Sequence, residues 1–193
     1  MKKRILIILG HPALARRSFC EALALAYQAG AQDAGHEAPL INVAQLRFDP
    51  VLHEGYHGNQ PAEPDIADVQ EKVRWAGHLV IVHPMWAFMM PALLKGFFER
   101  TFTPGFAYAR ESANPLKSGL LKGKSARVIQ TMGMPGIAYR LFFRAHGAKA
   151  FMSMLGFCGI APVRISYFGM IDGDDARRKR YLEKVRALGR AGA

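Results

Sequence analysis

The fold is decided by the run R-I-L-I-I-L at residues 4–9, which G-H-P at residues 10–12 brings to an end. A short run of β-branched and other apolar residues is typical of a strand that is buried on both faces of a parallel sheet. Ser18 then begins an alanine- and leucine-rich segment that extends to about Ala34 and has apolar residues at helical spacing. The start of the chain therefore predicts one strand followed by one helix.

The same alternation continues along the rest of the chain. Further strands are expected at residues 38–43, 78–83, 126–131 and 161–168, and further helices at residues 66–75, 91–100, 148–155 and 174–188. Strands that alternate with helices indicate an α/β domain whose parallel sheet is covered on both faces, and right-handed crossovers favour a doubly wound arrangement. The sequence thus predicts one domain over residues 1–193, with a five-stranded sheet in the order 2-1-3-4-5.

The composition is that of an ordinary globular protein with an unusual excess of positive charge. Hydrophobic residues make up 50% and charged residues 21%, but 26 lysines and arginines face 15 aspartates and glutamates, a formal net charge of +11. Much of the excess lies at residues 177–190, and such a surface can attract anionic lipid, nucleic acid or phosphorylated cofactors. A solvated basic helix is the simpler interpretation, and because no nucleic-acid module accompanies the charge, we expect no nucleic-acid partner.

The apolar segments and the cysteines indicate a cytoplasmic protein. Residues 5–9 are too short for the core of a signal peptide, and glycine, serine and proline interrupt the apolar stretch at residues 150–163. Cys20 and Cys158 both lie within apolar patterns, so we expect two buried free thiols in a reducing compartment.

Three loops follow the strands at the edge where doubly wound sheets bind ligands. Residues 10–19 lead into a helix N-terminus, and His11 and Arg17 add donors, so this loop fits either a phosphate site or a capped helix with surface arginines. Residues 83–91, H-P-M-W-A-F-M-M-P, fit a platform for a flat ring, with core packing as the alternative. Residues 130–139 contain glycines that allow close backbone approach. Together these loops indicate a flavin, since no G-x-G-x-x-G follows the first strand.

Two short motifs match known sites without the context that those sites need. Residues 53–57, H-E-G-Y-H, have the letters of a zinc motif, but glycines and flanking prolines exclude the helix that would place both histidines on one face. Residues 123–125, G-K-S, resemble the end of a P-loop, but Ser118 stands where its first glycine belongs and a strand follows. We therefore expect neither a metal site nor a nucleotide triphosphatase.

A longer block resembles a known family. Residues 84–102, P-M-W-A-F-M-M-P-A-L-L-K-G-F-F-E-R-T-F, with G-F-A-Y at residues 105–108, are similar to the signature of the flavodoxin-like NAD(P)H:quinone reductases. That family includes the DT-diaphorases, the modulator-of-drug-activity proteins and the ancillary subunits of glutathione-gated potassium-efflux systems. The resemblance covers nearly the whole chain. It implies a flavodoxin-like fold, bound FAD or FMN, NAD(P)H as co-substrate and a homodimer with its site at the interface.

The resemblance also implies roles for individual residues. It implies flavin contacts for His11, Arg17, Ser18, Phe19, Pro84, Met85, Trp86, Ala87, Phe88, Thr131, Met132 and Gly133. It further implies a substrate pocket walled by Phe88, Phe106 and Tyr108, and a catalytic role in charge balance for Tyr139. The chain departs from the family pattern at Met132, which replaces a glycine, and at Cys20, which replaces an asparagine.

These observations lead to one functional hypothesis and one alternative. The hypothesis is a flavin-dependent oxidoreductase that passes hydride from NAD(P)H to a quinone-like acceptor in a ping-pong cycle. The alternative is a flavin-binding regulatory subunit that docks on a membrane transport system through residues 177–190, peripherally at the inner face of the membrane. A one-electron carrier of the flavodoxin type is disfavoured, because such carriers are acidic.

Overall fold

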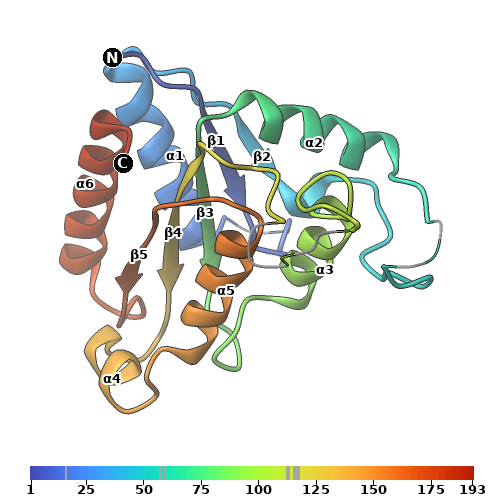
Figure 1. The fold of residues 1–193 in the computed structure, drawn as a ribbon. Coiled ribbons are helices and arrows are strands. Elements are labelled where there is room, and N and C mark those ends of the chain that lie inside the picture. The colour runs from blue at the N-terminus through green and yellow to red at the C-terminus, as the bar shows by residue number, and fades with distance from the viewer. Residues whose placement is uncertain (16, 57, 59, 112–113, 115–117) are drawn as a thin grey trace.

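The centre of the computed structural model is a five-stranded parallel sheet, and the model describes residues 1–15, 17–56, 58, 60–111, 114 and 118–193 (Figure 1). Its strands are β1 (Ile5–Leu9), β2 (Leu40–Asn42), β3 (His78–Pro84), β4 (Ser125–Thr131) and β5 (Val163–Phe168). Their order is β2-β1-β3-β4-β5, which confirms the predicted topology and places the switch in strand order between β1 and β3.

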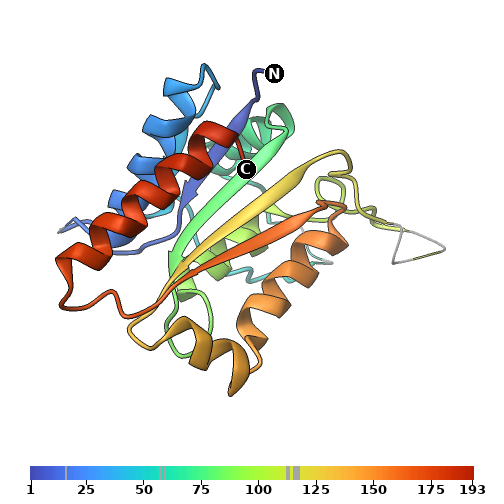
Figure 2. The same cartoon turned by 90° about the vertical axis from the view of Figure 1, so that its left-hand side faces the viewer.

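Helices cover both faces of the sheet. They are α1 (Phe19–Asp33), α2 (Pro64–Trp75), α3 (Ala92–Thr101), α4 (Gly136–Leu141), α5 (His146–Phe157) and α6 (Asp175–Ala191), with a 3-10 helix at Val43–Gln45. Helices α1 and α6 lie side by side on one face, and α2, α3 and α5 cover the other (Figures 1 and 2). Helix α4 lies beyond the carboxyl ends of β4 and β5, at the edge where the site was expected.

The apolar runs form the central strands because both of their faces are covered. Every residue of β1 and of β3 is buried. Leu6 and Ile8 pack into the core under α2, α3 and α5, while Ile5, Ile7 and Leu9 pack into the core under α1 and α6. Strand β5 is an edge strand, and most of it is only partly buried.

The structure differs from the expected elements mainly between residues 132 and 146. This segment was expected to be a loop, but it contains α4, whose six residues include one buried side chain, Tyr139. Pro135 precedes the helix, a position that tolerates proline because no helical N–H is needed there. One buried position gives no periodic pattern, which is why the sequence did not reveal this helix. In the described part of the chain, no helix is both long enough and apolar enough to span a membrane.

Candidate functional site

A cavity of about 510 Å³ opens at the carboxyl ends of β1, β3 and β4. It is lined by His11, Ala13, Arg17, Ser18, Phe19, Cys20, Pro84, Met85, Trp86, Thr131, Gly133, Ile171, Asp172 and Arg178. Nine of the twelve residues that the resemblance assigned to the cofactor are therefore brought together here. The other three, Ala87, Phe88 and Met132, do not line this cavity.

One end of the cavity is arranged to receive an anion. Ser18 caps α1, because its hydroxyl accepts a hydrogen bond from the backbone N–H of Glu21 at 3.1 Å. The positive end of the α1 dipole therefore faces the cavity beside the exposed Arg17. Arg178 adds a second guanidinium from α6; its Nε donates to the Ile171 carbonyl at 2.7 Å, and its Cζ lies 5.8 Å from the centre of the Phe19 ring.

The other end of the cavity is formed by the loop after β3. The Met85 N–H donates to the Thr131 carbonyl at 2.7 Å, which extends the pairing of β3 with β4 into the loop. The indole of Trp86 meets the imidazole of His11 edge to face, with ring centroids 5.7 Å apart. Since Trp86 is 48% exposed, its ring forms an open wall that a flat molecule could stack against.

The loop then reverses direction within two residues. Ala87 has φ 46° and Phe88 has φ 64°, both in the left-handed region that non-glycine residues seldom adopt. Trp86 and Met89 exchange backbone hydrogen bonds of 3.0 and 2.9 Å across this turn. Positive φ at both central residues is the geometry of the tightest hairpin turns. As a result, residues 84–86 and residues 89–90 face different parts of the molecule.

Tyr139 and Gly147 both contact the backbone of this turn, at the carbonyl of Phe88. The Tyr139 hydroxyl donates to the Phe88 carbonyl at 3.4 Å and accepts from the Ala148 N–H at 3.2 Å. A Cβ on Gly147 would stand 2.1 Å from the same carbonyl oxygen, so only glycine allows α5 to approach the turn this closely. Tyr139 is fully buried and does not line the 510 Å³ cavity; it contacts the backbone of the loop that does.

A second cavity, of about 350 Å³, lies beyond the turn and is mostly apolar. Its lining residues are Tyr56, Met89, Met90, Lys95, Phe98, Glu99, Phe102, Tyr108, Ala150, Phe151, Met154, Phe157 and Cys158. The ring of Tyr108 lies 5.0 Å from that of Phe157, and burial raises the pKa of Tyr108 to about 12, so its hydroxyl stays protonated.

The three residues expected to wall a substrate pocket lie in three different surroundings within one chain. Tyr108 lines the apolar cavity. Phe106 is buried in the core, with the guanidinium carbon of Arg74 4.8 Å from its ring centre. Phe88 is half-exposed at the turn, and its ring lies 4.7 Å from that of Phe143.

The structure shows where the two residues that depart from the family pattern, Cys20 and Met132, lie. Cys20 lines the 510 Å³ cavity, and its sulfur lies 3.2 Å from the Thr131 hydroxyl. Burial raises the pKa of this thiol to about 12, so it is a protonated, weakly polar group. Met132 is buried among Tyr139, Ala145 and Ala148, so its side chain packs beneath the site.

The sequence did not indicate one part of the lining of this cavity, the residues that follow β5. Ile171 and Asp172 lie in the segment between β5 and α6, and Arg178 reaches the cavity from the first turn of α6. The rule that ligands bind beyond the carboxyl ends of strands applies to β5 as well and could have indicated this segment.

The zinc-like motif does not form a helix. Residues 53–56 form a turn, and His53 Nε2 lies 2.9 Å from Asp49 Oδ2. His57, the second histidine of the motif, lies outside the described residues. Within the described residues, no three His, Cys, Asp or Glu side chains come together as a metal site would require.

A doubly wound sheet in the order 2-1-3-4-5, with a loop-lined cavity of about 510 Å³ next to the β1/β3 switch point, defines an α/β protein of the flavodoxin type. Residues 3–189 match the family described as flavodoxin-like fold, and the chain belongs to that family.

Its relatives include oxidoreductases. The chain is 30% identical over 184 residues to an uncharacterized NAD(P)H oxidoreductase of Haemophilus influenzae, which covers 92% of this chain and 90% of the relative. It is 31% identical over 156 residues to the human ribosyldihydronicotinamide dehydrogenase [quinone], and this alignment covers 77% of this chain and 66% of the relative. Among solved structures it is similar to Smu.1420 from Streptococcus mutans UA159, with a TM-score of 0.83, 30% identity, and coverage of 99% of this chain and 100% of that one.

Proposed function

We propose that this protein is a flavin-dependent NAD(P)H:quinone oxidoreductase, an enzyme of the NAD(P)H dehydrogenase (quinone) class. The observation that carries the proposal is the joining of an anion-binding helix N-terminus and an open aromatic wall in one cavity of about 510 Å³. The names of the H. influenzae and human relatives, an NAD(P)H oxidoreductase and a quinone-linked dehydrogenase, support the same activity.

The residues present fit a flavin. Arg17, Arg178 and the capped start of α1 suit its phosphate, and Met85 and Trp86 suit its flat ring system. Gly133 lines the same cavity and lets the Asp172 carboxylate lie close to it, since a Cβ there would come within 3.1 Å of Asp172 Oδ2. A ribityl chain joins the phosphate of a flavin to its ring system. The Asp172 carboxylate is an acceptor for the hydroxyls of that chain. These features account for the part that FMN and FAD have in common, and both remain candidates.

A bound flavin would supply the two-electron redox chemistry of hydride transfer. The protein would hold the reactants in place and orient them. NAD(P)H and the acceptor would occupy the same place beside the flavin ring in turn, as a ping-pong cycle requires, and the 48% exposure of Trp86 leaves this part of the cavity accessible to them. The positive end of α1, with Arg17 and Arg178, stabilises negative charge at this edge of the sheet.

The substrate pocket is proposed to be completed by a second copy of the chain. Within one chain, Phe88 lies in the turn and Tyr108 lines the apolar cavity beyond it, whereas a homodimer would bring one copy's Tyr108 toward the other copy's aromatic wall. Met89 is 42% exposed and Phe157 is 41% exposed beside Tyr108, and such grouped apolar side chains often mark an interface. Light scattering during gel filtration at micromolar concentration should give twice the chain mass, and a single-chain mass would exclude this arrangement.

The proposed enzyme activity has a direct test. Purified protein is saturated with FMN or FAD, and its absorbance spectrum is recorded under anaerobic conditions before and after NADPH and then menadione. NADPH should bleach the flavin bands and menadione should restore them. Flavin that binds but is bleached by neither NADPH nor NADH would exclude the proposed reaction.

A regulatory subunit of a membrane transport system remains the second candidate, and the charge of α6 is the observation in its favour. Asp33 pairs with Arg186 at 2.8 Å and with Arg190 at 3.7 Å, so part of the basic surface is neutralised. Lys179 and Arg180 form no ion pair within the described residues. Salt-sensitive sedimentation with vesicles that contain a transporter, but not with plain anionic vesicles, would favour this candidate.

A further inference from the structure

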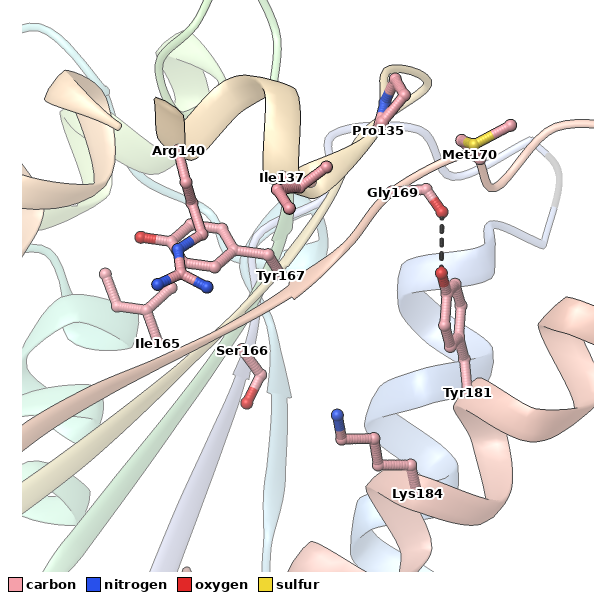
Figure 3. Close-up of a pocket in the computed structure, with 11 residues that line it drawn as sticks. Pro135, Ile137, Arg140, Ile165, Ser166, Tyr167, Gly169, Met170, Tyr181 and Lys184 are labelled. Atoms are coloured by element: carbon pink, nitrogen blue, oxygen red, sulfur yellow. Dashed lines mark hydrogen bonds between the residues drawn. The ribbon is translucent and has the colours of Figure 1, made fainter. Parts of the chain in front are cut away.

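A third cavity, of about 470 Å³, lies beside the edge strand β5 (Figure 3). It is bounded by α4, β5 and α6 and shares no lining residue with the proposed flavin cavity. Its lining contains two cations, Arg140 and Lys184, and three hydroxyl groups, those of Ser166, Tyr167 and Tyr181. No carboxylate is among its lining residues, all of which belong to the described part of the chain.

A buried arginine stands directly behind this cavity. Arg127 on β4 is 8% exposed, and its Nη1 donates to the Ser166 hydroxyl at 2.7 Å. Its Nε is buried without a hydrogen-bond partner. Its neighbour on β5 is Arg164, a second cation, and no described carboxylate lies within ion-pair distance. Burial lowers the pKa of Arg127; the nearby Tyr27 opposes this shift and Arg164 adds to it.

A buried guanidinium without a counter-ion is unusual in this protein. Arg100 is buried to a similar degree, but its Nη2 lies 2.8 Å from Glu63 Oε2 and 2.8 Å from the Pro61 carbonyl oxygen. Charges taken out of water are normally paired, because otherwise the loss of hydration is not offset. Among the described residues, Arg127 hydrogen-bonds only to a neutral hydroxyl and forms no ion pair, so this region carries a positive charge without a counter-ion.

Two hydrogen-bond donors line the cavity on the side of Arg127, the ammonium of Lys184 and the hydroxyl of Ser166. In Figure 3 the ammonium of Lys184 on α6 and the hydroxyl of Ser166 on β5 both point into the space between helix and strand. Because Ser166 accepts from Arg127, its own proton is available to donate into the cavity. The Tyr181 hydroxyl already donates to the Gly169 carbonyl at 3.0 Å, so Tyr181 contributes its ring rather than a further donor.

We propose that this cavity is a binding site for a small organic anion, a phosphate monoester or a carboxylate with an apolar body. Lys184 and the Ser166 hydroxyl receive the anionic group, and Arg127 behind Ser166 supplies the balancing charge. The ring of Tyr181 and the side chain of Met170 form an apolar wall for the body of the ligand. The cavity volume of about 470 Å³ exceeds the space that an inorganic ion needs, which favours an organic anion.

The test uses flavin-saturated protein, so that the flavin cavity is filled. Phenyl phosphate is titrated into wild-type protein, Lys184→Ala and Lys179→Ala by calorimetry; Lys179 is an exposed cation of the same helix that does not line the cavity. Lys184→Ala should weaken binding by about tenfold, the usual effect of losing one charge-assisted hydrogen bond, and Lys179→Ala should leave it unchanged. Ser166→Ala should weaken binding by a smaller factor, and inorganic phosphate should bind more weakly than phenyl phosphate.

Equal affinity in the wild type and Lys184→Ala, or no binding by the wild type, would overturn the proposal. If the protein binds no flavin, the same titrations are made on the apoprotein, together with Arg17→Ala. Binding that is lost in Arg17→Ala but kept in Lys184→Ala belongs to the proposed flavin cavity and also overturns the new site. Failure of flavin binding and failure of this site are therefore observed separately.

Discussion

The two cavities on either side of the loop after β3 differ in chemistry although they share one stretch of chain. Met85 and Trp86 line the 510 Å³ cavity beside α1, which we call the basic cavity because Arg17 and Arg178 line it. Met89 and Met90 line the apolar cavity next to α3 and α5. The change of side occurs at the turn with positive φ. Neighbouring methionines thus serve different environments, and a methionine-rich loop alone does not reveal which residues face a ligand.

The largest effect is expected from filling the space under the turn. Gly147→Ala would place a Cβ 2.1 Å from the Phe88 carbonyl oxygen, and both cavities should be disturbed as α5 moves away. We expect a loss of about 3 kcal/mol in the free energy of unfolding, measured by urea denaturation.

Gly156→Ala in the same helix is the matched control. Nothing lies within 4 Å of a Cβ at that position, so this variant should be as stable as the wild type or up to about 1 kcal/mol more stable. A Gly147→Ala variant of wild-type stability would show that α5 does not press on the turn.

The next effect is a dependence of stability on pH, and it comes from the buried histidine near the end of β3. His83 Nδ1 bonds to the Pro84 carbonyl at 2.8 Å, its ring meets Phe151 edge to face, and burial lowers its pKa from 6.5 to about 4. Because the folded-state pKa is the lower one, the unfolded chain takes up a proton first, and stability is lost as pH falls from about 6.5 toward 4. The full contribution is about 3 kcal/mol.

Comparison with His83→Asn isolates this contribution. Asparagine keeps a donor for the Pro84 carbonyl but does not titrate, so the slope of stability against pH should be shallower in the variant. The slope should not vanish entirely in His83→Asn, because burial also lowers the pKa of His78 to about 4 and His78 still titrates in the variant. Identical slopes would show that His83 is not kept neutral by its surroundings.

A smaller effect should be confined to the basic cavity. Arg17→Ala removes a cation beside the N-terminus of α1 and should weaken FMN binding by about tenfold, as measured by quenching of flavin fluorescence. Tyr108→Phe lies in the apolar cavity and should leave FMN affinity unchanged. If both variants bound FMN equally well, the division of roles between the cavities would be wrong.

The smallest effect is expected for Tyr139→Phe. The hydroxyl bridges the turn and α5, so its loss should cost about 1 kcal/mol in stability. The proposed catalytic role predicts in addition that one half-reaction slows while flavin stays bound. Stopped-flow measurement of both half-reactions separates the two roles, since unchanged rates would leave Tyr139 as a support of the turn only.

The sequence was sufficient to predict the sheet and the three loops, after β1, β3 and β4, that form most of the lining of the basic cavity. Strands β1 and β3 are read directly as apolar runs because both of their faces are buried, and the loops that follow must meet at one edge. Asp172 follows β5, and the rule for strand ends could have indicated it, but Arg178 reaches the cavity because α6 packs beside α1, which no local pattern encodes.

Individual side-chain directions were less predictable. Phe106 and Tyr108 stand two residues apart in one recognisable block, yet one is buried under Arg74 and the other lines the apolar cavity. Tyr139 faces the turn because α4 forms, and that helix of six residues has no periodic signal. Such placements follow from packing between distant segments, which spacing along the chain does not describe.

The most direct test of the account is a crystal structure of the protein with bound FMN. We predict that the phosphate lies at the N-terminus of α1 beside Arg17 and that the ring system lies along Met85 and Trp86, with the apolar cavity free of flavin. A flavin ring in the apolar cavity, or a phosphate away from α1, would contradict the assignment of the two cavities.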